Sequence, residues 1–168
     1  GDIWGLQFDR FLTEDDFNAD GSLKAGLPDQ TKVFPAGYQF APGDVLYKDL
    51  DNNGEIVKQT NTNDKGDLSV IGNALPRLQF GLNLDAAWKG FDISMFFQGV
   101  AKRKLWAAGN QVLPGFTTGE PFYKGAEDYW TPENTDAFYP RPMDYKQSAS
   151  GNYSVNDRYL LNMAYLRL

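Results

Sequence analysis

The tract from Leu78 to Gly99 constrains the fold of this chain more than any other feature. Apolar and polar residues alternate along it, so that every second side chain would share one face of an extended strand. The apolar positions of the first arm are Leu78, Phe80, Leu82, Leu84, Ala86 and Trp88, and those of the second are Phe91, Ile93, Met95 and Phe97. Lys89-Gly90 stands between the arms as a tight turn. The tract therefore predicts a long β-hairpin over 78–88 and 91–101.

Two environments would cover the apolar face of this hairpin. In a soluble β-sandwich the apolar face packs on a second sheet, and strands are usually about five or six residues long. In an outer-membrane barrel the apolar face meets lipid, and the strands have about ten residues with aromatic side chains near the interfaces. The long arms, the polar opposite face and the position of Trp88 beside the turn favour the barrel.

Weaker alternation predicts two more strands, near 2–11 and near 158–168. In the second of these, the alternation runs to the last residue of the sequence without a turn or cap. We therefore expect the chain to be a piece of a larger sheet, an all-β, partial antiparallel transmembrane barrel with about four strands. A barrel complete in itself would need at least about eight strands.

Two long irregular tracts, 12–77 and 102–157, separate these strands and are rich in glycine, proline and other turn formers. Ordinary connections have about 4–6 residues, whereas barrels combine short periplasmic turns with longer extracellular loops. The two tracts are therefore predicted to be extracellular loops. Near the start of the first, Thr13 and Asp16 have the spacing of a capping box, which predicts a short helix.

Composition excludes several classes of function. The 168 residues include no cysteine and no histidine, which removes disulfides, thiolate metal sites, cysteine nucleophiles and the Ser-His-Asp triad. Acidic residues outnumber basic ones, 22 to 16, which argues against nucleic-acid binding. Neighbouring carboxylates such as Glu127-Asp128 and Asp15-Asp16 could suggest a glycoside hydrolase. Chance pairs are expected in so acidic a chain, and we assign no catalytic residue.

A segment that resembles the start of a calcium loop is the clearest local motif. Oxygen-bearing side chains occupy its first, third and fifth positions and glycine its sixth; these residues are Asp49, Asp51, Asn53 and Gly54. Thr60 stands where a carboxylate is expected, and Asp64 or Asp67 could replace it if the residues between loop out. A solvated turn rich in Asp and Asn is the alternative.

Aromatic residues gather in the second irregular tract: Tyr123, Tyr129, Trp130, Phe138 and Tyr139. Such side chains stack on sugars, form partner interfaces or pack into a small core of the loop itself. The last of these is the interpretation we favour. The basic cluster at 102–104 directly follows the hairpin. It is predicted to be a solvated rim that contacts anionic lipopolysaccharide.

Several short sequence segments, taken together and in the order in which they occur, resemble the SusC/RagA-type TonB-dependent outer-membrane transporters. They are PGDVLYKDLD (42–51), VIGNALPR (70–77), GLNL (81–84), KGFDISMFFQG (89–99), YWTPEN (129–134), YPR (139–141) and DRY (157–159). The resemblance implies a plugged barrel of about 22 strands, of which this chain would be a piece near the C-terminal end. It also implies import of oligosaccharides or peptides, energy relayed by TonB, and a SusD-like surface lipoprotein as partner.

The same resemblance implies a calcium ligand set, Asp49, Asp51, Asn53 and Asp67, although the insert 57–66 departs from the family pattern. Two alternatives to the transporter remain. The first is a soluble secreted β-rich carbohydrate-binding module, and the second is a glycoside hydrolase.

Overall fold

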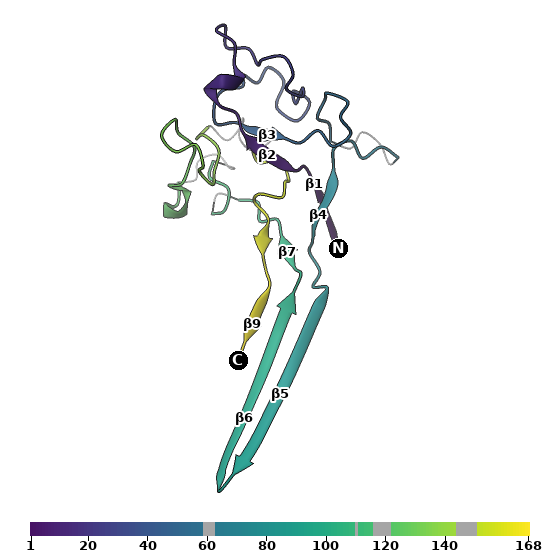
Figure 1. The fold of residues 1–168 in the computed structure, drawn as a ribbon, viewed down its shortest axis with the longest axis vertical. Helices are drawn as coiled ribbons and strands as arrows, with labels where there is room; N and C mark the ends of the chain where they lie inside the picture. The colour runs from purple at the N-terminus through teal and green to yellow at the C-terminus, as the bar shows by residue number, and fades with distance from the viewer. Residues whose placement is uncertain (59–62, 110, 116–121, 144–150) are drawn as a thin grey trace.

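The structure, a computed structural model, describes residues 1–58, 63–109, 111–115, 122–143 and 151–168. Within these ranges it is all-β apart from two single-turn 3₁₀ helices, and a long hairpin projects from a loop-rich body (Figure 1). The elements are β1 (Asp2–Gly5), β2 (Phe8–Phe11), η1 (Glu14–Asp16), β3 (Val45–Tyr47), β4 (Ser69–Asn73), β5 (Leu78–Trp88), β6 (Phe91–Ala101), β7 (Lys104–Leu105), η2 (Lys124–Ala126), β8 (Leu161–Asn162) and β9 (Tyr165–Arg167). Across the described ranges, we find no helix with the length and apolar character needed to cross a membrane.

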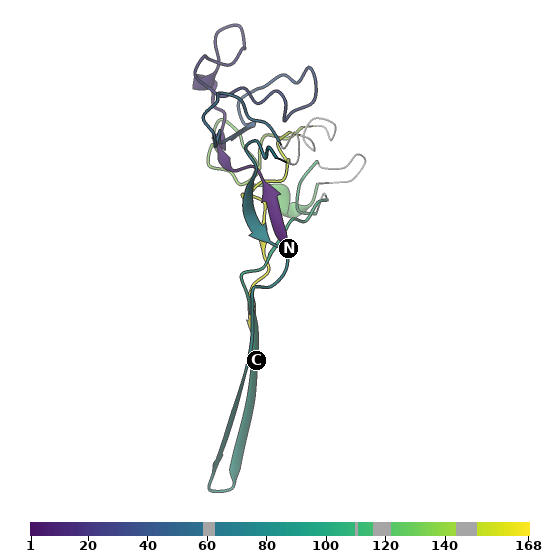
Figure 2. The same ribbon diagram turned by 90° about the vertical axis from the view of Figure 1, so that its right-hand side faces the viewer.

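Strands β5 and β6 form the hairpin, and their bounds coincide with the two predicted arms. They pair antiparallel without a bulge, from Leu78 opposite Ala101 to Trp88 opposite Phe91. Lys89 and Gly90 have φ of 46° and 88°, the left-handed values that a two-residue hairpin turn requires at both central positions. Two perpendicular views show the hairpin extending clear of the loop-rich body (Figures 1 and 2). Its apolar face is therefore uncovered in the part of the chain that the structure describes.

Glycine positions on the hairpin let aromatic rings lie across neighbouring strands. A Cβ atom at Gly99 would stand 2.3 Å from the Phe80 ring, on the apolar face. On the polar face, a Cβ at Gly81 would stand 3.2 Å from the ring of Phe96. Each ring fills the space that the glycine leaves and covers its backbone, which strengthens the pairing of the two strands.

The first predicted strand, near 2–11, is two strands in the structure. β1 pairs with β4 and β2 pairs with β3, so both partners come from the tract 12–77 that was predicted to be a loop. The break falls at Leu6, which is fully buried. Its N–H donates to Val155 O at 2.9 Å and its carbonyl accepts from Asp157 N at 3.3 Å. These bonds hold the backbone of Leu6 against the C-terminal segment and end the first ladder.

The C-terminal segment near 158–168 is also divided. β8 pairs with β7, and β9 pairs with the end of β6, between Gln98 and Val100. Between them, Asn162 Oδ1 accepts a hydrogen bond from Ala164 N at 3.1 Å, and Met163 N donates to Arg103 O at 3.0 Å. The local turn at Asn162 interrupts an alternation that continues on both sides of it.

The hydrophobic core lies in the loop-rich body and not along the hairpin. Its buried members are Leu6, Phe11, Val33, Phe34, Val45, Tyr47, Ile56, Trp130 and Ala137. Trp130 thus packs with residues of β2 and β3, whereas the aromatic tract 123–139 was predicted to build a core of its own. Phe138 and Tyr129 remain 42% and 40% exposed. Two residues of the tract, Trp130 and Ala137, thus join this shared core, and Tyr139 packs against a second cluster made of Leu113, Tyr153 and Tyr159. Because Leu113 and Tyr153 belong to the same irregular tract, the predicted loop core is present in part, and several rings remain accessible.

Arg158 fastens the C-terminal segment to this core. Its guanidinium carbon lies 4.3 Å from the centre of the Phe8 ring, within the range of a cation–π contact. Its nitrogens donate to Phe138 O at 2.9 Å and to Ala137 O at 2.6 Å. One side chain thus joins β2 to the aromatic tract.

The predicted capping box is present at η1, a single 3₁₀ turn. The Asp16 carboxylate accepts a hydrogen bond from Thr13 N at 2.8 Å and two from the Arg10 guanidinium, at 2.6 and 2.8 Å. The hydrogen bond from Arg10 and then that from Thr13 hold the pKa of Asp16 at about 2, below its ordinary 3.8, although desolvation opposes them. The contacts of Asp16 therefore favour its ionised form.

Asp16→Asn is expected to loosen the segment around η1 at neutral pH, with a difference from the unchanged protein that disappears in acid. Because the folded pKa lies below the ordinary value, this carboxylate stabilises the fold above about pH 4 and loses the effect as the pH falls toward 2. Amide hydrogen exchange of residues 10–17 against pH measures the difference. An equal difference at all pH values in that window would contradict this account.

Candidate functional site

The calcium-like loop brings three carboxylates together. One carboxylate oxygen from each of Asp49, Asp51 and Asp67 lies within 4.8 Å of the other two. The chain curls because Asn52 and Gly54 adopt φ of 58° and 86°. With these left-handed values the backbone bends around the carboxylate cluster, as the backbone of a short calcium-binding loop bends around its cation.

Asp67 lies next to the other two carboxylates because hydrogen bonds join the two ends of the insert 57–66. Asp67 N donates to Val57 O at 2.9 Å, and Val57 N donates to Asp67 Oδ2 at 2.8 Å. Asp67 Oδ1 also accepts from Leu50 N at 2.8 Å, and the side chain is fully buried. Of the two substitutes that the sequence offered, Asp64 bonds to Gly66 N at 2.9 Å and is not in the cluster. Thr60 lies outside the described residues.

Asn53 is turned toward its neighbours within the loop. Its Nδ2 donates to Asp51 Oδ2 at 2.9 Å, and its Oδ1 accepts from Glu55 N at 2.8 Å. The amide of Gly54 donates to Asp49 Oδ2 at 2.8 Å. The structure therefore collects three of the four expected ligands as carboxylates and uses the side chain of Asn53 in hydrogen bonds.

The donor set fits calcium. Asp49 Oδ1 is buried and has no hydrogen-bond partner among the described residues, which leaves one carboxylate oxygen able to ligate a cation. Desolvation raises the pKa of Asp49, but hydrogen bonds from the loop amides, with that of Gly54 foremost, outweigh it and leave the pKa below its ordinary value. Ionised oxygen ligands are those that calcium prefers. Asp49, Asp51 and Asp67 would hold the ion.

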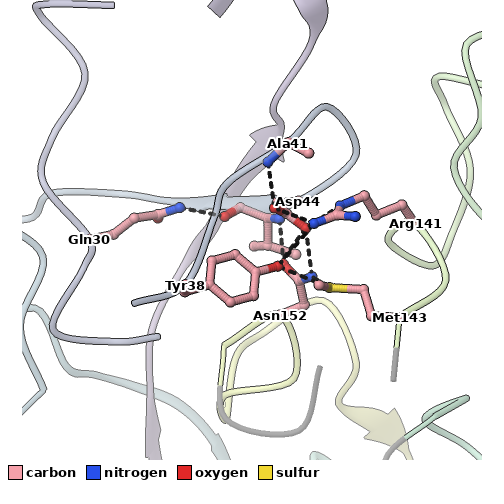
Figure 3. A network of polar contacts seen from close by, with 8 residues as sticks. Gln30, Tyr38, Ala41, Asp44, Arg141, Met143 and Asn152 are labelled. Carbon is pink, nitrogen blue, oxygen red and sulfur yellow. Dashed lines mark hydrogen bonds and ion pairs between the residues drawn. The ribbon is translucent and has the colours of Figure 1, made fainter. Parts of the chain in front are cut away.

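A second polar cluster joins three separate loop segments around Asp44 (Figure 3). This fully buried carboxylate accepts hydrogen bonds from Arg141 Nε at 2.8 Å, Asn152 Nδ2 at 3.0 Å, Tyr38 Oη at 2.9 Å and Ala41 N at 2.9 Å. Burial, followed by the charge of Asp44, raises the pKa of Tyr38 well above its ordinary value, so its hydroxyl stays protonated and donates. Every partner of Asp44 is a donor, which compensates its desolvation.

The same cluster continues into the short strand β3. Asn152 Oδ1 accepts from Val45 N at 2.7 Å, and Gln30 Nε2 donates to Val45 O at 2.8 Å. Tyr47 Oη donates to Gly151 O at 2.8 Å. Side chains thus supply hydrogen bonds that a longer ladder would otherwise provide, and they position the loops relative to one another.

A pocket of about 420 Å³ opens beside the aromatic tract. Its aromatic lining consists of Phe122, Tyr123, Tyr129, Tyr139 and Tyr153, with Lys124 and Glu127 as its charged groups. The sequence signalled aromatic residues here but not that most of them would surround an opening. Rings with charged groups at the edge suit a ligand that combines apolar and polar faces.

One carboxylate of each pair that could suggest glycoside hydrolysis is held in structural contacts. Asp16 binds Arg10, as described above. Asp128 accepts hydrogen bonds from Asn134 Nδ2 at 3.1 Å and Phe138 N at 3.0 Å. These contacts assign both residues a role in shaping loops.

Comparison with known proteins gives two relatives, both from Formosa agariphila. TonB-dependent receptor P3 is 31% identical over 133 residues, which are 76% of this chain and 11% of that protein. TonB-dependent receptor P26 is 36% identical over 95 residues, 54% of this chain and 9% of that protein. The chain spans about a tenth of the length of these curated relatives. No protein-family model matches it. The two similarities support the identification of this chain as part of a TonB-dependent receptor.

Proposed function

We propose that this chain forms barrel wall and extracellular loops of a SusC/RagA-type TonB-dependent transporter in the bacterial outer membrane. The hairpin of β5 and β6 carries this proposal. Strands of 11 residues are about 36 Å long, and a tilt of about 40° gives them a height of about 28 Å. That height matches the apolar band of about 25 Å on such barrels. The apolar face would meet lipid, with Trp88 and Phe91 at the interface beside the turn.

The polar face and the open edges of the sheet fit the same proposal. Asp85, Gln98 and Arg167 lie on the face that would line the barrel interior. In the described part of the chain, β5 is hydrogen-bonded along one edge only, to β6. An 11-residue edge left unpaired in lipid would be costly. Another strand of the same transporter would pair with β5.

The proposed cargo is an oligosaccharide or a peptide, and the proposed partners are TonB and a SusD-like lipoprotein that closes over the loops. The aromatic pocket beside Tyr129 offers the loops a surface for such cargo. Lys102 is exposed directly beyond the apolar band, where lipopolysaccharide phosphates would lie. Translocation requires no covalent step, and the role of these residues is contact and positioning.

Fractionation of the full-length protein tests this proposal. A transporter remains in the outer-membrane fraction until detergent is added. Recovery in aqueous extract would contradict it and favour the soluble carbohydrate-binding module. The hydrolase alternative predicts glycan cleavage that is lost when Glu127 and Asp128 are both replaced by their amides.

We further propose that the Asp49 loop binds calcium when the protein is exposed to the extracellular medium. Calcium at about 100 times its dissociation constant would stabilise the folded loop by about 2.7 kcal/mol. We expect added calcium to slow proteolysis of the 49–67 segment in the full-length protein, and Asp51→Ala to abolish the effect.

Asp92→Ala is the control for this prediction, because Asp92 is an exposed carboxylate beside the hairpin turn and outside the cluster. It should retain the full response to calcium. If chelation leaves the proteolysis of the unchanged protein as it was, the loop does not bind calcium.

A further inference from the structure

Asn53-Gly54 is the only Asn-Gly pair in the sequence, and both residues are exposed. An Asn followed by Gly is prone to deamidation, because the backbone nitrogen of the glycine is not shielded by a Cβ. That nitrogen attacks the side-chain carbon Cγ of the asparagine, the new N–C bond closes a succinimide ring, and ammonia leaves. Water then opens the ring to aspartate or isoaspartate. The reaction needs no reagent other than water.

In this loop each of the three reacting groups is held by a hydrogen bond. The nucleophile, Gly54 N, donates its hydrogen to Asp49 Oδ2 at 2.8 Å. The carbonyl oxygen under attack, Asn53 Oδ1, accepts from Glu55 N at 2.8 Å. The departing nitrogen, Asn53 Nδ2, donates to Asp51 Oδ2 at 2.9 Å. The side chain of Asn53 is thus fixed at both ends.

The hydrogen bond from Gly54 N to Asp49 Oδ2 controls the first step of deamidation, the attack of this nitrogen on Asn53 Cγ. Attack requires the glycine nitrogen to give up its hydrogen and turn toward Cγ. A hydrogen bond to a carboxylate is stronger than one to a neutral acceptor, and it holds the N–H in its present direction. The reaction is therefore slowest while Asp49 keeps this contact, even though the pair is exposed to water.

We propose that Asn53 is a deamidation site and that Asp49 protects it by binding the amide of Gly54. Aspartate at position 53 would place a further negative charge beside Asp51. Isoaspartate would lengthen the backbone by one atom and displace the bond to Glu55 N. Either product alters the carboxylate cluster, so the modification would change the loop with time. These contacts lie within the loop itself and are independent of transport.

Two substitutions of one residue test this assignment in the full-length protein. Asp49→Ala removes the acceptor of the Gly54 N–H, whereas Asp49→Asn keeps an oxygen there. Both remove the same charge from the carboxylate cluster, and the incubation contains a chelator, so that no bound cation distinguishes the two variants. Deamidation is measured by peptide mapping after incubation at physiological temperature and pH.

We expect Asp49→Ala to deamidate about ten-fold faster than the unchanged protein. This factor corresponds to about 1.4 kcal/mol, which is close to the lower end of the range of about 1.5–3 kcal/mol for a hydrogen bond to a charged group. Asp49→Asn keeps a neutral acceptor and should deamidate at a rate between those of Asp49→Ala and the unchanged protein. Equal rates in the two variants, whether fast or slow, would overturn the role of Asp49. A synthetic peptide spanning 47–58 supplies the unprotected rate. If the unchanged protein deamidates as fast as that peptide, the proposed protection is wrong, irrespective of how the variants fold.

Discussion

Leu84→Arg is expected to prevent the hairpin from assembling in the outer membrane. Leu84 lies near the middle of β5 on the apolar face, opposite Met95 of β6, and is 43% exposed. An arginine on the lipid face of a barrel costs about 2–4 kcal/mol at the bilayer midplane. The folded, outer-membrane fraction of the full-length protein should fall sharply. Heat-modifiable migration in gels, which distinguishes folded from unfolded barrels, measures that fraction.

Asn83→Arg is the matched control for this prediction. Asn83 is the preceding residue, lies on the polar face opposite Phe96, and is also exposed. The same side chain is thus introduced at nearly the same height but toward the barrel interior, and most of the protein should still fold. Equal losses in the two variants would contradict the assignment of the two faces.

Asp44→Ala is expected to release the loop segments that meet at Asp44. Its removal leaves the Arg141 guanidinium without an anion and the side chains of Tyr38 and Asn152 without an acceptor. Removing one member of a buried ion pair costs about 3–5 kcal/mol. We expect about 3 kcal/mol, because the Arg141 side chain is 26% exposed and water would solvate part of the freed charge. Hydrogen exchange of residues 38–47 in the full-length protein measures the loss.

Two further variants show whether the loss comes from the Asp44 contacts. Asp20→Ala removes an exposed carboxylate that bonds only within its own turn, to Ser22, and should change stability by less than about 0.5 kcal/mol. The double variant Asp44→Ala, Arg141→Met removes the unpaired charge and should recover part of the loss. Equal exchange in Asp44→Ala and Asp20→Ala would contradict the account of this cluster.

The hairpin could be predicted residue by residue because its signal is local. Apolar and polar side chains alternate along the whole of β5, so the period of two is visible in the sequence. β3 gives no such signal, because Val45, Leu46 and Tyr47 are all buried and apolar on both faces. Leu6 ends β1 through backbone bonds to residues 155 and 157. No window of the sequence around Leu6 contains that information.

The candidate sites differ in the same way. Asp49 and Asp51 belong to one short motif, whereas Asp67 was one of two candidates that depended on the insert looping out, and the family resemblance selected it. Asp44 and Arg141 are 97 residues apart, and nothing in either local sequence indicates that they meet. Trp130 was grouped with its aromatic neighbours, although its buried position depends on β2 and β3. Long-range packing determines these contacts, and neither sequence periodicity nor short motifs contain information about long-range packing.

Membrane topology shows whether the hairpin crosses the outer membrane in the proposed direction. In the proposed transporter the turn at Lys89 lies on the periplasmic side and the loop around Ala25 lies outside the cell, and both residues are exposed. Single cysteines replacing each of them in the full-length protein would be treated with a membrane-impermeant maleimide on intact cells, with permeabilised cells as the reactivity control. The account predicts that Ala25→Cys is labelled on intact cells and that Lys89→Cys is labelled only after permeabilisation. Labelling of Lys89→Cys on intact cells would contradict it.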